Sequence, residues 1–426
     1  MTSSFCAARE RHYAEVMTSS ELHAQGLRVR AAASALATAP DAQRRAVLGA
    51  VAEALQTHRA ELLRVNAVEV SAYAEGGAGR DRLALTEARI GAMADALREV
   101  AAAPDPLYEV LDHDVRPNGL DVSRVRVPLG VIGVVYENRP NVTSDVAGLC
   151  VRSGNAAFLR GSSSALSTNR AIVALWRRAL SDNGLPEDAV SLVEDVSHEA
   201  AVAFMQLDDV LDCLIPRGGP SLIAAMREHA RVPYVLDGDG NCHVYVDDAA
   251  DLDMAARIVV NAKTSRPGVC NAAETLLVHE RVAPDFLPVV AAMMPQVELR
   301  GDDATRALID ARPASEDDFA REFLDLVMAV RVVGSLDEAI AHVARFGTGH
   351  SEAIVTNDAA HAEEWVRRVD AAAVLVNAST RFIDGGELGL GGEVGISTQK
   401  LHARGPMGLR ELTCLKWVVR GTGQVR

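Results

Sequence analysis

Apolar residues recur at helical spacing along the first quarter of the chain. In residues 22–103 they follow one another three or four positions apart, as Leu48, Val51 and Leu55 do, and runs of β-branched residues are few. Such spacing gathers the apolar side chains on one face of a helix. We therefore predict several amphipathic helices, which end where Pro104 breaks the pattern.

The pattern then changes to one typical of a β-hairpin. Residues 115–122 place Asn118 and Gly119 between two short segments in which apolar and polar residues alternate. Asn-Gly readily adopts the left-handed backbone of a hairpin turn, so we predict a projecting hairpin here. Near the end of the chain, residues 415–419 have the composition of a strand. We expect this strand to pair with the hairpin of a neighbouring subunit, which predicts a homo-oligomer.

Continuous apolar runs alternate with helical segments from residue 131 onward. Such runs are typical of parallel strands that are buried on both faces. Their order predicts a doubly wound, dinucleotide-binding α/β domain and, after residue 240, a second α/β series. The first domain has expected strands at residues 131–135, 156–159, 190–193 and 210–215, with helices at 168–180 and from about residue 144. The second has expected strands at 244–246, 275–278 and 374–376, followed by a Gly-rich loop at 385–395.

Composition supports a soluble α/β protein with more than one domain. The chain has 426 residues, of which 49% are apolar and only 4% aromatic, and this length predicts two or three domains. The net charge is -15, from 43 basic and 58 acidic residues, so no basic surface for nucleic acid is expected. No apolar run approaches the roughly 18–20 residues of a membrane span, and no signal-peptide pattern opens the chain, so we expect a cytoplasmic protein with no membrane partner.

One cysteine of the six stands in a context that favours chemistry. The six are scattered singly, without a CxxC pair or a histidine cluster at zinc spacing, so neither disulfides nor a metal site is expected. A buried, inert side chain is the ordinary interpretation for each of them. Cys270, however, follows a Pro267-Gly268 turn and precedes an apolar strand, which can expose its thiol. A thiolate there would attack an acyl phosphate readily, because phosphate is a good leaving group and the resulting thioester accepts hydride.

A turn and four longer segments carry a family resemblance. Residues 136–140, Tyr-Glu-Asn-Arg-Pro after a buried strand, are similar to the aromatic-Asn-Pro turn of aldehyde dehydrogenases. Residues 338–354 resemble the signature of one family in that superfamily, the gamma-glutamyl phosphate reductases. Three further segments resemble the same family, at residues 240–247, 269–278 and 395–408. The resemblance extends from about Leu27 to about Gly421.

The resemblance implies a fold, a reaction and partners. The expected fold is aldehyde dehydrogenase-like, with a Rossmann-type cofactor domain at residues 1–112 and 129–235, an α/β catalytic domain at 236–404, and a small β oligomerisation element at 113–128 and 405–426. The implied reaction is NADPH-dependent reduction of L-glutamate 5-phosphate to L-glutamate 5-semialdehyde and phosphate, the second step of proline biosynthesis from glutamate. The implied partners are further copies of the chain, as a dimer or tetramer, and a glutamate 5-kinase that channels the substrate.

The resemblance also assigns roles to single residues. Cys270 becomes the nucleophile, and the amide N–H of Asn138 becomes a donor to the developing oxyanion. A preorganised donor of this kind contributes roughly 3 to 4 kcal/mol to the transition state. Taken without the other motifs, Asn138 is more simply an ordinary turn residue.

Five residues are expected to bind the coenzyme. Ser163 stands where NAD-preferring relatives carry a Glu, so an anion that would repel the 2′-phosphate of NADP is missing. Gly218 and Gly219 open a helix after a strand and can present backbone N–H groups to a pyrophosphate. The other two are Arg160, in the place of the usual Lys beside the adenosine ribose, and Glu322, in the place of the Glu that meets the nicotinamide ribose.

A phosphate and an α-carboxylate on the substrate both require cations. Four candidates lie in or beside the motif loops, and the sequence does not divide them between the two anions. His350 and Ser351 lie inside the family signature and are expected to shape the substrate pocket, although a lone His is more often structural. The four candidate cations are Arg139, Lys263, Arg266 and Arg381.

A departure from the superfamily bears on the reaction. Hydrolytic aldehyde dehydrogenases have a Glu-Leu-Gly-Gly segment whose Glu activates water, whereas this chain reads Val-Leu-Asp-Gly-Asp-Gly at residues 235–240. Asp237 has a shorter arm, and a turn built on Asp-Gly is the simpler role for Asp237 and Asp239. A reductive enzyme needs no such base, and its absence protects the thioester from water.

Three other functions stay open at this stage. A related semialdehyde or acyl-CoA reductase would share Cys270 but not residues 350–352, His-Ser-Glu. A binding protein that had lost catalysis is disfavoured by the intact Cys270, Asn138 and Glu322, and a cysteine hydrolase by the βαβ organisation.

Residues 1–16, which precede any apolar periodicity, are interpreted as an extension outside the fold.

Overall fold

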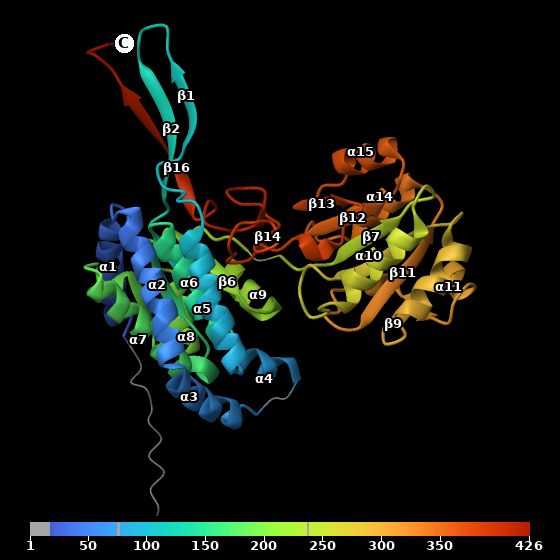
Figure 1. The fold of residues 1–426 in the computed structure, drawn as a ribbon, viewed down its shortest axis with the longest axis horizontal. Helices are drawn as coiled ribbons and strands as arrows, with labels where there is room; N and C mark the ends of the chain where they lie inside the picture. Colours follow the sequence, from blue (N-terminus) through green and yellow to red (C-terminus); the bar gives the residue numbers. More distant parts are fainter. Residues whose placement is uncertain (1–17, 75–76, 237) are drawn as a thin grey trace, which may run out of the picture. The chain divides into compact units, whose positions relative to one another are not determined.

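The computed structural model describes residues 18–74, 77–236 and 238–426 (Figure 1). The expected extension at residues 1–16 lies outside the described residues. The chain divides into two compact units, and each is described by itself. Unit 1 takes its residues from 1–101 and 128–234, and unit 2 from 102–127 and 235–426.

Unit 1 begins with the amphipathic helices that the apolar spacing predicts. The first of them starts at a capping box, in which the Thr18 hydroxyl accepts from the Glu21 N–H and the Glu21 carboxylate accepts from Thr18 N–H at 2.8 Å. Such a box satisfies backbone N–H groups that a helix start leaves free. The helices are α1 (Ser19–Leu36), α2 (Asp41–Thr57), α3 (Arg59–Ala72), α4 (Gly77–Leu83) and α5 (Glu87–Ala102).

A four-stranded parallel sheet forms the centre of unit 1. Its strands are β3 (Val131–Tyr136), β4 (Ala156–Arg160), β5 (Val190–Leu192) and β6 (Cys213–Arg217), in the order β5-β4-β3-β6. The strand order reverses between β3 and β6, and in open α/β sheets ligands bind beyond the carboxyl ends of strands at such a point. The connecting elements are α6 (Pro140–Arg152), η1 (Ser163–Ala165), α7 (Leu166–Asp182), η2 (Glu187–Ala189), α8 (His198–Met205) and α9 (Pro220–His229).

Helix α6 starts earlier than the sequence analysis expected. We predicted a beginning near Ser144, and the helix begins at Pro140. Proline is well suited to the first turn of a helix, where its missing N–H would have no partner. The turn after β3 is therefore short, and it holds only residues 137–139 between strand and helix.

Unit 2 is built on a seven-stranded parallel sheet. Its order is β10-β9-β11-β8-β7-β12-β13. The strands are β7 (Cys242–Val246), β8 (Ala273–His279), β9 (Glu298–Gly301), β10 (Arg312–Pro313), β11 (Val327–Val333), β12 (Ser351–Val355) and β13 (Ala373–Val376). The helices are α10 (Leu252–Thr264), α11 (Ala283–Met293), α12 (Asp303–Arg306), α13 (Glu316–Phe319), α14 (Leu336–Phe346) and α15 (Ala359–Arg368), with η3 at Thr380–Phe382.

Both faces of this sheet are buried, which explains its continuous apolar strands. On one face, Val244 and Val246 pack with α10 and α11. On the other, Tyr245 packs with α14 and α15. Successive residues of a strand point to opposite faces, so a strand covered on both sides must be apolar throughout.

The predicted hairpin is present, and the tail strand joins it within the same chain. Strands β1 (Val110–Val115) and β2 (Asp121–Pro128) pair in antiparallel fashion, and Gly119 in the connecting turn has φ 82°. Strand β16 (Thr413–Arg420) lies next to β2, in the order β1-β2-β16. The expectation that this strand pairs with the hairpin of a neighbouring subunit is therefore corrected: the partner is intramolecular. A short pair, β14 (Ile396–Ser397) and β15 (Gly405–Pro406), completes the described strands of unit 2.

Among the helices of the described residues, none combines the length and the apolar character that a membrane crossing requires.

Candidate active site

Cys270 lies at the amino edge of the seven-stranded sheet. It comes shortly before β8, Gly240 comes shortly before β7, and Ser351 is the first residue of β12. These three strands are parallel neighbours, so their amino ends meet at one edge. The Cys270 side chain is partly exposed. The Cys270 turn, residues 265–272, therefore presents a thiol at this edge.

The backbone of the turn is packed closely against the start of β7. A Cβ on Gly240 would lie 1.6 Å from the Cys270 carbonyl oxygen, so only glycine fits there. The buried Cys242 thiol donates to the same carbonyl oxygen at 3.1 Å. Burial raises the pKa of Cys242 well above its ordinary range, which keeps this second thiol protonated and able to donate.

Asn271 ties the turn to the segment that follows β13. Its Nδ2 donates to the Ile383 carbonyl at 2.8 Å, and its own carbonyl accepts from Thr380 Oγ1 at 2.6 Å. The Arg381 guanidinium donates to Asn271 Oδ1 through Nη1 and to Ser265 Oγ through Nε at 3.2 Å. Arg381 thus contacts both flanks of the Cys270 turn.

A buried ion pair closes the base of the turn. Lys263, in the last turn of α10, and Glu274, in β8, have fully buried side chains and meet at 2.7 Å between Nζ and Oε2. Burial raises the pKa of Glu274 to about 7 and lowers that of Lys263, while each partner opposes the shift in the other. Because its ammonium is enclosed in this pair, the structure does not favour our expectation that Lys263 meets a substrate anion.

Glu274 also holds a strained residue in the segment before β11. Its Oε1 accepts from the Leu324 N–H at 3.1 Å, and Leu324 has φ 54°. A leucine in the left-handed region is uncommon and costs roughly 1 kcal/mol or more, so the surroundings must enforce it. The same segment carries Glu322, whose Oε1 accepts from the Gly240 N–H at 2.9 Å. The expected ribose ligand Glu322 therefore lies at the same edge as Cys270.

His350 and Ser351 stand behind the turn. Both side chains are fully buried. His350 Nδ1 lies 2.8 Å from Ser351 Oγ and 3.6 Å from Cys242 Sγ. His350 thus contacts Cys242, whose thiol donates to the Cys270 carbonyl. That His350 and Ser351 shape the substrate pocket stays a prediction.

Asn138 occupies the turn between β3 and α6 in unit 1. Its Nδ2 donates to Tyr73 Oη at 2.8 Å, and its Oδ1 accepts from Ser162 Oγ at 2.9 Å and from Ser164 Oγ. The amide is thus oriented by three hydroxyl groups, which fixes where its N–H points. Arg139 follows as the N-cap residue of α6 and is partly buried.

Two expected coenzyme residues lie at the carboxyl end of β4. Arg160 ends that strand, and its Nη2 donates to the carbonyls of Val196 and Ser197 at 2.7 and 2.9 Å. Burial lowers the pKa of Arg160, and nearby Asp195 opposes this shift; the guanidinium stays charged in any case. Its buried Nε has no hydrogen-bond partner among the described residues. Ser163 is exposed at the start of η1.

The expected pyrophosphate turn lies at the carboxyl end of β6. Gly218 and Gly219 lead into α9, and the Gly219 N–H donates to Glu137 Oε2 at 3.2 Å. A Cβ on Gly218 would lie 2.7 Å from Cδ of Glu137. This N–H group therefore binds an anionic oxygen in the structure, as expected for a helix start.

Sequence reasoning missed the residues that support the turn. Asn271, Glu274 and Cys242 all lie within the quoted motifs, yet none was given a role. Glu274 carried a usable signal, because a carboxylate beside a continuous apolar strand needs a buried partner. For Asn271 and Cys242 there was no such signal, since their partners are distant in sequence. Asp237, weighed as a substitute base, lies outside the described residues.

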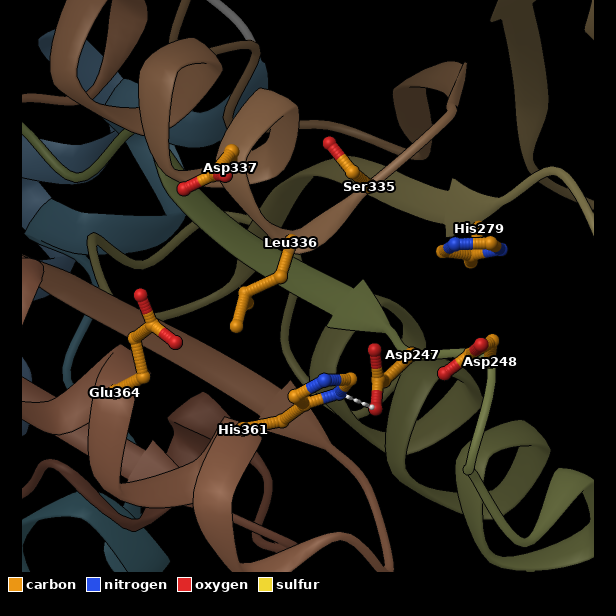
Figure 2. A pocket seen from close by; sticks show the side chains of 8 residues that line it. All are labelled: Asp247, Asp248, His279, Ser335, Leu336, Asp337, His361 and Glu364. Atoms are coloured by element: carbon orange, nitrogen blue, oxygen red, sulfur yellow. Dashed lines mark hydrogen bonds and ion pairs between the residues drawn. The ribbon is translucent and has the colours of Figure 1, made fainter.

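A hollow opens at the opposite, carboxyl edge of the same sheet (Figure 2). Its volume is about 260 Å³, and its eight lining residues are Asp247, Asp248, His279, Ser335, Leu336, Asp337, His361 and Glu364. Among the residues that the structure describes, three of these could offer ligand atoms within 4.8 Å of one another: Asp247, Asp248 and His361.

The acidic groups of this hollow are already engaged. Asp247 accepts from His361 Nδ1 at 2.8 Å, as the dashed line in Figure 2 shows, and from Thr356 Oγ1 at 2.6 Å. That hydrogen bond raises the pKa of His361, which favours the imidazolium over a metal-binding imidazole. Asp248 pairs with Arg281 at 2.7 Å. We therefore assign these residues a structural role.

Comparisons with known proteins agree on one family. The model of the aldehyde dehydrogenase family matches residues 4–318. A gamma-glutamyl phosphate reductase from Moorella thermoacetica is 54% identical over 412 residues, which is 95% of this chain and 99% of that protein. A protein of the same name from Xanthomonas campestris is 51% identical over 406 residues, 94% of this chain and 98% of its own length.

Solved structures give the same picture. The crystal structure of a gamma-glutamyl phosphate reductase from Thermotoga maritima matches with a TM-score of 0.93 and 46% identity, covering 95% of this chain and 100% of that one. An acetylating aldehyde dehydrogenase from Geobacillus thermoglucosidasius matches with a TM-score of 0.71 at 17% identity, covering 96% and 98%. At that identity, the second likeness concerns the fold alone.

Proposed function

Because the chain belongs to the aldehyde dehydrogenase family, and within it to the gamma-glutamyl phosphate reductases, we propose that it reduces L-glutamate 5-phosphate to L-glutamate 5-semialdehyde and phosphate with NADPH. In this role it performs the second step of proline biosynthesis from glutamate. The observation that carries the proposal is the partly exposed Cys270 on a turn held by close packing and hydrogen bonds. The contacts come from Gly240, Cys242, Asn271 and the pair of Lys263 and Glu274.

Cys270 acts as the nucleophile in the proposed mechanism. Its thiolate attacks the acyl carbonyl, the carbonyl carbon forms a bond to sulfur, and the bond to the phosphate oxygen breaks, so phosphate leaves and a thioester remains. When bound, the reduced nicotinamide would supply a hydride to the carbonyl carbon of the thioester. The resulting tetrahedral oxyanion, still bonded to the sulfur of Cys270, then collapses, and the thiolate departs as the aldehyde forms. The backbone N–H of Cys270 and the amide of Asn138 are the proposed donors to the oxyanion.

Rigidity of the Cys270 turn suits this chemistry. Three sets of contacts fix the backbone that carries the sulfur: the close packing of Gly240 against the Cys270 carbonyl, the hydrogen bond from the Cys242 thiol, and the hydrogen bonds of Asn271. A nucleophile and a backbone donor that need no rearrangement lower the barrier, because their orientation is provided by folding. Of the expected cations, Arg266 and Arg381 on unit 2 and Arg139 on unit 1 remain our proposed ligands for the phosphate and the α-carboxylate.

The residues of unit 1 fit a phosphorylated dinucleotide. The charged guanidinium of Arg160 lies at the carboxyl edge of the sheet, and its buried Nε has no hydrogen-bond partner among the described residues. Exposed Ser163 adds a hydroxyl rather than an anion. The Gly219 N–H donates to an anionic oxygen, that of Glu137. The cation at Arg160 and the hydroxyl at Ser163 support NADP(H), because the 2′-phosphate requires a cation. Glu322 is the proposed ligand of the nicotinamide ribose.

The reaction is tested in reverse. The semialdehyde cyclises to pyrroline-5-carboxylate, which therefore serves as the substrate together with NADP. We expect NADPH to form only when phosphate is added. An acyl-CoA reductase would require coenzyme A in place of phosphate, and a hydrolytic aldehyde dehydrogenase would require neither. Absence of phosphate-dependent NADPH formation, with coenzyme binding verified, would exclude the proposed activity.

Cys270→Ser tests the nucleophile. We expect a loss of kcat of at least about a thousandfold with NADPH affinity retained, because a hydroxyl is far less acidic than a thiol. Ser181→Ala, at an exposed residue of α7, is the control and should behave as the unmodified protein. Retained turnover in Cys270→Ser would move the nucleophile elsewhere.

We also propose a homo-oligomer that forms through the sheet β1-β2-β16. Strand β1 is exposed along its whole length, and exposed apolar side chains of this sheet include Val115, Trp417 and Val419. Exposed apolar side chains and unpaired strand edges favour association with a further copy. The molar mass in solution, measured by light scattering, should exceed that of one chain, and Trp417→Glu should reduce it.

A further inference from the structure

Two arginines lie beside the proposed nucleophile, and they differ in how they are held. Arg266 belongs to the Cys270 turn itself, is exposed, and makes no hydrogen bond or ion pair with any residue that the structure describes. Arg381 is partly buried and donates to Ser265 and Asn271. A charge on an exposed, untethered side chain is screened by water, whereas a tethered, partly buried charge is screened much less.

The tether determines where the Arg381 charge lies. Ser265 begins the turn and Asn271 directly follows Cys270, so bonds to both hold the guanidinium across the turn. Thr380 and Ile383, on either side of Arg381, are themselves bonded to Asn271. The backbone and the side chain of this segment are thus fixed to the same residue. The guanidinium cannot move away from Cys270 without breaking these contacts.

We propose that Arg381 is a positioning residue for the nucleophile: its guanidinium, tethered to both flanks of the Cys270 turn, supplies the positive charge that favours the thiolate of Cys270 before any substrate binds. This inference rests on the proposed function, which makes Cys270 the nucleophile. It adds the origin of the reactive thiolate, because a thiol becomes nucleophilic at neutral pH when a nearby cation stabilises its ionised form.

The electrostatic surroundings of Arg381 agree with this assignment. The pKa of Arg381 is lowered chiefly by burial; Asp384, Cys270 and Glu387 raise it, and Arg266 lowers it. Arg381 and Cys270 therefore interact. An arginine keeps its charge throughout the range in which a thiol titrates, so the benefit to the thiolate is permanent.

The other charged groups near the turn are a buried ion pair and several carboxylates. Lys263 is paired with Glu274 at 2.7 Å, whereas Glu322 accepts from the neutral Gly240 N–H and keeps its negative charge. Behind the turn, Cys242 is held as a neutral thiol by burial, with His350 at 3.6 Å from its sulfur. Asp384 and Glu387 act on Arg381 from the loop that follows η3 and reduce its effect. Arg381 thus provides the tethered positive charge at the nucleophile.

The test measures the ionisation of Cys270 without substrate or coenzyme. The rate at which iodoacetamide alkylates Cys270 is followed as a function of pH, and the modified residue is identified by mass spectrometry. Cys414, on β16 of the proposed oligomer sheet, is followed in every sample as a reference, because its surroundings are the same in all variants. Arg381→Gln removes the charge and keeps hydrogen-bond donors, whereas Arg381→Lys keeps the charge. Arg257→Gln, at an exposed residue of α10, is the matched control.

We expect Arg381→Gln to raise the midpoint of the Cys270 alkylation profile by at least about one pH unit, the usual effect of losing a nearby opposite charge. Arg381→Lys should restore most of the shift, and Arg257→Gln should leave the midpoint unchanged. Alkylation of Cys414 should follow the same profile in all variants. A midpoint in Arg381→Gln equal to that of the unmodified protein would overturn the proposal.

A second variant covers the case in which Arg381→Gln does not fold. Asn271→Ser removes the Oδ1 that holds Arg381 but keeps the charge, and it should raise the midpoint by a smaller amount; an unchanged midpoint there overturns the proposal too. These outcomes are separate from the fate of the proposed function. An active enzyme with an unaltered alkylation profile contradicts only the role of Arg381, whereas absence of phosphate-dependent activity contradicts the reaction.

Discussion

The two parallel sheets of this protein place their candidate functional residues at opposite edges. In unit 1 they lie at the carboxyl edge, where Arg160 ends β4 and Gly218 follows β6. In unit 2 they lie at the amino edge, where Cys270 precedes β8 and Gly240 precedes β7. The carboxyl edge of a parallel sheet is the usual place for a bound ligand, since helices begin there.

The difference shows in how the two sites are built. The carboxyl edge of unit 1 offers the Nε of Arg160, which has no hydrogen-bond partner among the described residues, and the exposed hydroxyl of Ser163. The amino edge of unit 2 instead uses its polar groups on itself, in the buried pair of Lys263 and Glu274 and in the bonds of Asn271. This contrast agrees with the proposed roles, in which one edge binds the coenzyme and the other holds the nucleophile in place. Substitutions at the amino edge should therefore damage stability and chemistry together, and those at the carboxyl edge only coenzyme affinity.

Lys263→Met is the strongest test of this contrast. It leaves the Glu274 carboxylate buried without its cation, and breaking such a pair costs about 3–5 kcal/mol of unfolding free energy. Denaturant unfolding measures the loss. Lys400→Met is the matched control, because the pair of Lys400 and Asp370 is exposed, with side-chain accessibilities of 67% and 62%, and such pairs contribute little. A stable Lys263→Met would mean that the amino edge does not depend on this pair.

Gly240→Ala tests the position of the Cys270 turn. The added Cβ would meet the Cys270 backbone at 1.6 Å, so the turn must move, and we expect about a hundredfold lower kcat because the sulfur leaves its attack position. Gly268→Ala adds the same methyl group within the same turn, where the nearest atom lies at 3.7 Å, and should be tolerated. Equal activities in steady-state assays of the two variants would contradict the proposed rigidity of the site.

Arg160→Gln tests the carboxyl edge and has the smallest expected effect. Loss of a charge-assisted contact to the 2′-phosphate should raise the KM for NADPH about tenfold, with kcat and the unfolding free energy little changed. The KM for NADH should stay the same, because that coenzyme has no 2′-phosphate. Arg178→Gln, at a surface residue of α7 whose side chain is 81% exposed, is the control. If the KM rose equally for both coenzymes, Arg160 would have a structural role and would not contact the 2′-phosphate.

Much of this architecture could be predicted from the chain itself. The helical spacing of residues 22–103, the hairpin around Gly119 and the apolar runs of both sheets correspond to elements of the structure, because each follows from a local periodicity. The resemblance of long motifs led to the family, which the comparisons confirm. The start of α6 was harder to predict, since a proline can stand in the first turn of a helix or end one.

The sequence by itself thus determined the amphipathic helices before Pro104, the hairpin, the apolar strands that it predicted, the family, and the thiol at Cys270 as the residue most favoured for chemistry. Only the tertiary structure decided which partners each polar side chain has. It enclosed Lys263 with Glu274, set His350 behind Cys242 and paired β16 with β2 of the same chain. The physical reason is that burial and charge pairing depend on strand order, which brings residues distant in sequence to one edge of a sheet, and the spacing of residues along the chain carries no record of that order.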